Sequence, residues 1–184
     1  MSARDLELVT RAADFAARAH AMQHRKGLAE EPYVNHLTEV AALLAGAIED
    51  DDVELIAAAY LHDTLEDTAT RYEDLDMQFG ANIARLVAEV TDDKSLPKTE
   101  RKRLQEEKAP HKSPRAKLVK IADKTSNLRS IAKSPPVGWD LDRQRQYFDW
   151  AARVVAGCRG TNATLERWFD EAHAAGLAAL AERR

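Results

Sequence analysis

The chain has 184 residues, of which 45% are hydrophobic and 32% are charged, and its formal net charge is −4 at pH 7. This length and composition are typical of one globular domain and exclude an intrinsically disordered chain. The negative charge argues against nucleic-acid binding, because no excess of cations is available to neutralise phosphates, and no apolar run approaches the ~20 residues of a membrane span.

The N-terminal segment is expected to form a helix rather than an export signal. It carries Asp5 and Glu7 and lacks the apolar stretch of a signal peptide. A stripe of apolar residues with helical spacing follows, consisting of Leu8, Ala12, Phe15, Ala19 and Met22. Gly27 is the expected end of this helix.

Helical periodicity continues through the middle of the chain. A second helix is expected at 34–48, and a third is expected to start near Asp51 or Asp52 and to continue through Leu65. Thr70 and Glu73 have the spacing of a capping box that would open a short helix.

The second half of the chain adds further helices, expected at about 83–90, after Pro97, at 114–131, at 140–157 and at 162–181. The predicted fold is therefore all-α, a single domain over residues 1–184 with about ten helices and room for one short hairpin in a loop. The lone Cys158 excludes an intrachain disulfide and predicts a reducing, cytoplasmic location. The oligomeric state stays open.

Residues 61–68, LHDTLEDT, are the most informative segment. On a continuous helix with about 100° per residue, His62, Asp63, Glu66 and Asp67 share one arc of roughly 140° beside the apolar stripe. A solvated polar face would explain the two acids at 66 and 67, but it explains an adjacent His-Asp pair less well. The segment alone leaves a metal site and a solvated face equally open.

A metal site would need ligands from other segments. His36 lies at an expected helix start in PYVNHL, and Asp123 lies on an expected helix in KIADKTSNL. Two imidazoles and two carboxylates suit Mn²⁺, Fe²⁺ or Zn²⁺ better than Ca²⁺, which prefers oxygen ligands only. Taken singly, His36 is better explained as a capping or partly buried histidine than as a ligand, and Asp123 as a salt-bridge partner of Lys120 or Lys124.

The order H…HD…D resembles the HD-domain metal-dependent phosphohydrolases. The longer segments AAAYLHDTLEDT, VTDDKSLPKTERK and KLVKIADKTSNLR are similar to the (p)ppGpp hydrolase domain of RelA/SpoT proteins. They most resemble the stand-alone small alarmone hydrolases related to the metazoan SpoT homologue. The resemblance spans about residues 5–162 and implies an HD-domain helical bundle that hydrolyses without a synthetase domain. Leu37 and Thr125 depart from the family pattern, which often has proline and an apolar residue there.

The resemblance also implies an activity and a set of site residues. The enzyme would remove the 3′-pyrophosphate from the guanosine alarmones ppGpp and pppGpp, the signals of the stringent response, leaving GDP or GTP. The implied cofactor is one Mn²⁺, with Zn²⁺ or Fe²⁺ as substitutes. Its implied ligands are His36, His62, Asp63 and Asp123. Glu66 and Asp67 match the acidic pair that handles the attacking water and the proton transfers.

Substrate contacts are implied at six further positions. In the family, Arg25 and Lys26 flank the nucleobase. The residues that help to hold the ribose and phosphates are Lys98, Asn127, Arg143 and Tyr147. An acidic protein must gather such cations locally to bind a polyanion. The neighbouring Arg101, Lys102 and Arg103 are expected to be surface residues.

Two other function classes remain. One is a phosphohydrolase for a different nucleotide, such as an enzyme that removes the 2′-phosphate of NADPH, which needs a similar metal and purine-ribose pocket. The other is a module that binds alarmones or a partner without catalysis. Glu66 and Asp67 argue against the binding module, because binding alone needs no acid-base pair.

Overall fold

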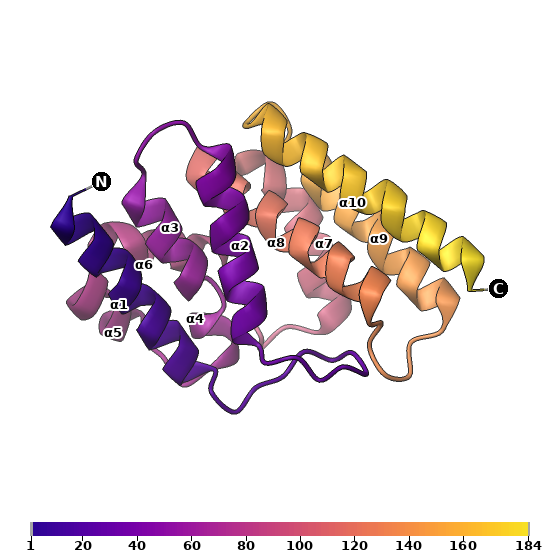
Figure 1. Ribbon diagram of the computed structural model, residues 1–184, viewed down its shortest axis with the longest axis horizontal. Coiled ribbons are helices and arrows are strands. Elements are labelled where there is room, and N and C mark those ends of the chain that lie inside the picture. Colours follow the sequence, from indigo (N-terminus) through magenta and orange to yellow (C-terminus); the bar gives the residue numbers. More distant parts are fainter. Residues whose placement is uncertain (1, 184) are drawn as a thin grey trace.

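The computed structural model describes residues 2–183, which form ten α-helices and one 3₁₀ turn and contain no strand (Figure 1). The first six helices are α1 (Ala3–Ala19), α2 (Val34–Ala47), α3 (Val53–Leu61), α4 (Thr64–Asp67), α5 (Tyr72–Phe79) and α6 (Ala81–Val90). The remaining elements are α7 (Lys98–Lys108), η1 (Ala109–His111), α8 (Pro114–Lys133), α9 (Leu141–Ala156) and α10 (Ala163–Glu182). The predicted all-α fold class is confirmed.

Helix α8 runs through the centre of the molecule, with α2 on one side and α9 and α10 on the other (Figure 1). Its residues Ile121 and Leu128 are fully buried in the common core. The same helix also buries Lys120, Asp123 and Lys124. Burying charged groups costs free energy unless they are paired or bound, so this side of α8 marks the functional region.

Local caps fix where several helices begin. Asp52, Ser113, Asp140 and Asn162 each occupy an N-cap position, and each side chain accepts a hydrogen bond from a backbone N–H in the first turn. Such caps satisfy donors that have no partner within the helix. Because capping is a local property, these starts agree with the helix starts predicted from the sequence.

The end of the first helix and the start of the fifth differ from the predictions. Helix α1 ends at Ala19, well before Gly27, and Met22 is 90% exposed instead of continuing the apolar stripe. The predicted capping box at Thr70 and Glu73 is also wrong. Helix α5 begins one residue later, and the backbone N–H of Arg71 donates to Asp74 Oδ2 at 2.9 Å.

The predicted continuous helix from Asp52 to Leu65 is interrupted at the His-Asp pair. Helix α3 ends at Leu61, and α4 begins at Thr64. His62 Nδ1 lies 2.7 Å from the Ala59 carbonyl, and Thr64 Oγ1 donates to the Leu61 carbonyl at 2.7 Å. Two side chains thus occupy carbonyls that a continuous helix would use, which explains the break.

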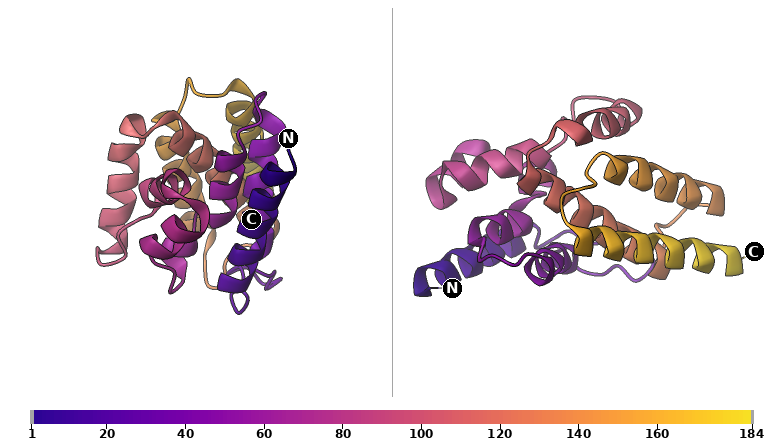
Figure 2. Two further views of the ribbon diagram at one scale, coloured as in Figure 1. Left: turned by 90° about the vertical axis from the view of Figure 1, so that its left-hand side faces the viewer. Right: turned by 90° about the horizontal axis from the view of Figure 1, so that it is seen from above.

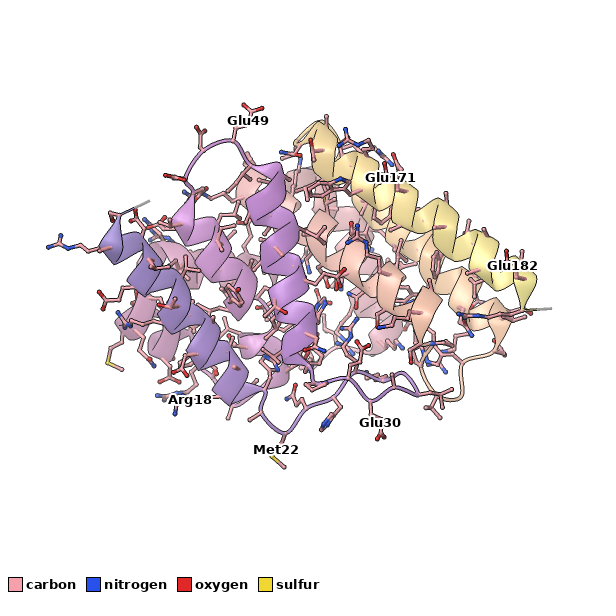
Figure 3. The ribbon with its side chains drawn as sticks, in the orientation of Figure 1. Arg18, Met22, Glu30, Glu49, Glu171 and Glu182 are labelled. Carbon is pink, nitrogen blue, oxygen red and sulfur yellow. The ribbon has the colours of Figure 1, made fainter. Side chains whose placement is uncertain are left out.

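The loop between α1 and α2 takes the place of the expected hairpin. It contains one isolated bridge, His24–Pro32, and a second bridge joins Gly27 to Pro136 in the loop before α9. Met22 and Glu30 point away from the bundle (Figure 3). The loop between α1 and α2 and the loop before α9 together form one side of a wide cleft. None of the helices in residues 2–183 is long and apolar enough to cross a membrane.

Candidate metal centre and substrate cleft

Four side chains from three regions of the chain meet in the interior. His36 comes from α2, His62 and Asp63 from the break between α3 and α4, and Asp123 from α8. His36 Nε2 lies 3.5 Å from Asp63 Oδ2 and 3.3 Å from Asp123 Oδ1. His62 Nε2 lies 3.1 Å from Asp63 Oδ2 and 4.0 Å from Asp123 Oδ1. The structure therefore brings together all four residues that the family resemblance implies as ligands.

The outer ring atoms of both histidines are held by the protein. His62 Nδ1 donates to the Ala59 carbonyl. His36 Nδ1 lies 2.9 Å from Ser126 Oγ, whose hydroxyl donates to Glu39 Oε2 at 2.7 Å. The serine oxygen is therefore an acceptor for His36, and the Nε2 atoms of both rings face the aspartates at the centre. Metal-binding histidines are commonly oriented in this way.

The donor set fits a divalent cation. His36, His62 and Asp123 are buried, and one ligand atom from each lies within 4.8 Å of the others. His62 Nε2 is buried without a hydrogen-bond partner, which is costly unless another group binds it. Two imidazole nitrogens with carboxylate oxygens match the preferences of first-row divalent metals.

The charges of the four groups are interdependent. Burial alone would raise the pKa of Asp123, but Lys124, whose Nζ lies 2.9 Å away, and the two imidazoles hold it well below its usual range. Burial lowers the pKa of His62, but Asp63 and Asp123 outweigh that effect and raise it to about 9. Burial would also raise the pKa of Asp63, but the two imidazoles hold it well below its usual range, so both aspartates are ionised at neutral pH and available to a cation.

The acidic pair lies beside this centre. Tyr33 donates its hydroxyl to Asp63 Oδ2 at 2.7 Å and lies 3.4 Å from Asp67 Oδ2, and Lys94 forms an ion pair with Asp67. Glu66 Oε2 accepts a hydrogen bond from the backbone N–H of Asp92 at 3.2 Å. Burial, together with the charges of Asp92 and Asp63, raises the pKa of Glu66 to about 6. Glu66 can therefore exchange a proton near neutral pH.

A wide cleft of about 570 Å³ lies next to a deeper pocket of about 150 Å³ at the candidate metal centre. The two cavities share six residues: Tyr33, Glu66, Asp67, Asp92, Gln105 and Asn127. The cleft is rich in cations, which are Arg25, Lys26, Lys94, Lys98, Arg101 and Lys102. A polyanionic ligand could lie along these cations and place one end at the metal centre.

Five of the six predicted substrate residues line this cleft: Arg25, Lys26, Lys98, Asn127 and Tyr147. Arg143 does not line it. Its guanidinium stacks over the Trp139 ring, 4.6 Å from the centroid, and Trp139 is a cleft residue. Arg25 donates to Asn127 Oδ1 at 2.9 Å, and Asn127 donates to Asp123 Oδ1 at 2.6 Å. The substrate wall is thus linked to a predicted metal ligand.

An aromatic wall supports the cations. Trp139 and Tyr147 have ring centroids 5.7 Å apart, and Tyr147 and Trp150 have centroids 5.2 Å apart. Lys102 Nζ lies 4.6 Å from the Trp150 ring centroid. Burial and neighbouring positive charges, including Lys98, lower the pKa of Lys102. Positively charged side chains that lie close together over these aromatic rings repel one another. An anionic ligand would offset this repulsion, so the cleft favours an anion.

Part of this cleft differs from the expectation. Arg101 and Lys102 were expected to be surface residues, but both line it, and the Arg101 side chain is only 24% exposed. Arg103 is on the outer surface as expected, with its side chain 59% exposed. The usable signal was the helical spacing of Lys98, Arg101 and Lys102, which places all three on one face.

The HD domain family matches residues 12–149 of this chain, a range that includes all four predicted ligands. The chain belongs to the HD-domain family. Human guanosine-3′,5′-bis(diphosphate) 3′-pyrophosphohydrolase MESH1 is 54% identical to this HD-domain protein over 155 residues, which cover 84% of this chain and 87% of the human protein. The Drosophila melanogaster protein of the same name is 50% identical over 157 residues, covering 85% and 88%.

A solved structure supports the same grouping of this HD domain. It is described as a metazoan ortholog of SpoT that hydrolyzes ppGpp and plays a role in starvation responses. That chain is 46% identical to this one, and the two structures match with a TM-score of 0.86 over 94% of each chain. The resemblance to the SpoT-related small hydrolases is therefore confirmed at the level of the family.

Proposed function

We propose that this protein is a metal-dependent hydrolase that removes the 3′-pyrophosphate from guanosine-3′,5′-bis(diphosphate). The observation that carries the proposal is the convergence of two histidine Nε2 atoms and two aspartates at the floor of a cationic cleft. The MESH1 relatives, named for this reaction, support it.

The chemistry divides among the residues of the site. When bound by His36, His62, Asp63 and Asp123, a divalent ion supplies positive charge that acidifies water and offsets the charge of phosphate. Glu66, with a pKa of about 6, takes a proton from the attacking water and returns it to the leaving ribose oxygen. Asp67, fixed by Lys94 and the Tyr33 hydroxyl, orients the water.

The cleft binds the rest of the substrate. Arg25 and Lys26 flank the guanine, and Lys98, Asn127 and Tyr147 hold the ribose and the 5′-phosphates. Arg143 acts from the rim, where it stacks on Trp139. The substrate is therefore a small nucleotide rather than a nucleic acid or a membrane lipid.

The proposal also covers the metal, the location and the organisation of the chain. Mn²⁺ is the ion in our assignment, with Zn²⁺ and Fe²⁺ able to replace it at a site of this composition. The protein acts in the cytoplasm, where guanosine nucleotides are present and the buried Cys158 stays reduced. Residues 1–184 work as one domain.

Product analysis tests the proposed function. Purified protein is stripped of metal, incubated with ppGpp and then supplied with Mn²⁺. We expect equal amounts of GDP and pyrophosphate, formed only after the metal is added. NADPH is incubated in parallel, with release of inorganic phosphate as the readout. Turnover of NADPH at ~100-fold higher kcat/KM, about 2.7 kcal/mol in transition-state binding, would overturn the assignment of the substrate.

A further inference from the structure

The inner face of α7 is polar where a packed helix is normally apolar. Lys98, Arg101, Lys102 and Gln105 have the spacing of one helix face, and all four line the cleft. The helix buries none of its residues and lies at the outer edge of the molecule (Figure 2). Core packing therefore does not explain why these residues face inward, whereas a hydrophilic ligand in the cleft does.

Two atoms on this face are buried and lack a hydrogen-bond partner, Arg101 Nε and Gln105 Oε1. Arg101 makes one long contact, from its guanidinium to Glu66 Oε1 at 3.4 Å. The side-chain amide nitrogen of Gln105 donates to the carboxylate of Asp92, which leaves the amide oxygen unused. A buried donor and a buried acceptor that both lack partners are costly. Here they lie one helical turn apart on the wall of the cleft, and Gln105 also lines the deep pocket.

The charges beside the deep pocket show which of the two residues meets an anion. Three lysines lie near Glu66 and the deep pocket, and each has a partner. Lys94 is paired with Asp67, Lys124 is paired with Asp123, and Lys120 donates to the Val90 carbonyl. Arg101 contacts a carboxylate through one nitrogen and keeps the rest of its donor fork available. The Gln105 oxygen accepts hydrogen bonds and cannot bind an anion. The phosphate group that reaches Glu66 therefore meets the guanidinium of Arg101.

We propose that Arg101 is a further catalytic residue, which binds the diphosphate group transferred to water. This inference rests on the proposed function. The water oxygen forms a bond to the phosphorus attached to the 3′ oxygen, and the bond between that phosphorus and the 3′ oxygen breaks. One water proton passes through Glu66 to the 3′ oxygen, and the other stays on the released pyrophosphate. When Arg101 engages the diphosphate it leaves Glu66, whose carboxylate is then free to accept the proton.

Arg101→Ala tests this role, with Arg103→Ala as the matched control. Arg103 lies on the same helix but faces outward and pairs with Glu100 and Glu107. Initial rates with ppGpp are measured at a fixed concentration of free Mn²⁺, with added pyrophosphate or GDP as product inhibitor. For Arg101→Ala we expect kcat to fall about 10²-fold or more, inhibition by pyrophosphate to weaken about tenfold, and inhibition by GDP to stay unchanged. Arg103→Ala should match the wild type throughout.

The controls separate the possible failures. A wild-type protein that releases no pyrophosphate overturns the proposed function and the role of Arg101 with it. An active wild type with Arg101→Ala equal to Arg103→Ala overturns the role of Arg101 alone. The role of Arg101 is also overturned if kcat falls together with Mn²⁺ binding. The same holds if kcat falls while inhibition by pyrophosphate stays unchanged. If the alanine variant does not fold, Arg101→Lys decides, because a lysine keeps the charge but loses the fork and should weaken inhibition by pyrophosphate.

Discussion

Asp63 and Glu66 are three residues apart but lie in opposite electrostatic environments. Asp63 Oδ2 lies within 3.5 Å of both imidazole Nε2 atoms and accepts the Tyr33 hydroxyl, and its pKa is lowered in spite of burial. Glu66 is partly buried near two other carboxylates, and its pKa is raised to about 6. One carboxylate therefore stays ionised as a ligand, and the other exchanges protons near neutral pH.

Substitutions at these two positions should separate metal binding from catalysis. Asp63→Ala removes a ligand oxygen, so we expect metal binding and turnover to be lost together. Glu66→Gln keeps the shape of the side chain but cannot take a proton, so Mn²⁺ should remain bound while kcat falls about 10²-fold or more. Calorimetric titration with Mn²⁺ and steady-state rates measure both effects. Loss of metal in Glu66→Gln would show that Glu66 is a ligand instead.

The raised pKa of Glu66 also predicts how stability depends on pH. The folded protein holds this proton more tightly than the unfolded chain, so the stabilising contribution is full below pH 4.5 and is lost as the pH rises through about 6. In metal-free protein, Glu66→Gln should therefore raise the free energy of unfolding at pH 8 by up to about 2 kcal/mol. Urea unfolding at pH 8 and pH 4.5 measures the difference. An equal gain at both values would contradict the assignment.

Residue types and their neighbours in the sequence could suggest which residues bind the metal. They could not suggest which charged residues pair with the acidic side chains of the site. The HD pair and the family resemblance pointed to His62, Asp63 and the acidic pair. The pairing of Lys94 with Asp67, and of Arg101 with Glu66, joins residues far apart in the chain. Such contacts depend on how α7 and the loop before it fold back over α4, which no local pattern encodes.

At the scale of elements, helix starts were more predictable than helix ends. Caps such as Ser113 act within one turn, so their sequence signal is local. The end of α3 depends on which donors take the carbonyls of Ala59 and Leu61, and side chains take both. The helical arc calculated for residues 62–67 assumed a continuous helix and was wrong in geometry, although Glu66 and the His-Asp pair do line one pocket.

The contact between the two loops at the cleft gives a prediction for Gly27. A Cβ atom there would lie 2.3 Å from the Ser134 carbonyl oxygen and 2.4 Å from Ser134 Oγ, so the loops must separate. Gly27→Ala should lower the free energy of unfolding by about 1–3 kcal/mol. It should also raise KM for ppGpp, because Lys26 moves with the loop. Leu28→Ala, at a side chain that is 77% exposed, is the control and should change neither value. Equal effects in both variants would contradict the close packing.

At the scale of the whole molecule, the site depends on α8 crossing the centre of the bundle. The helix carries Asp123 inward to meet His36 from α2 and the His-Asp pair that follows α3. Hydrophobic periodicity predicted each of these helices separately. It could not predict their distances from one another, which result from packing of the common core. The sequence therefore reached the ligand set through family resemblance, and the structure supplies the distances.

The number of ions bound per chain tests the convergence of the four ligands most directly. Metal-free wild-type protein and Asp123→Ala are titrated with Mn²⁺ and followed by electron paramagnetic resonance of the free ion. Our structure predicts one tightly bound Mn²⁺ per wild-type chain and none in the variant, because the ligands from α2, α3 and α8 enclose a single centre. A wild-type protein that binds no ion, or an Asp123→Ala variant that binds Mn²⁺ as tightly as the wild type, would contradict it.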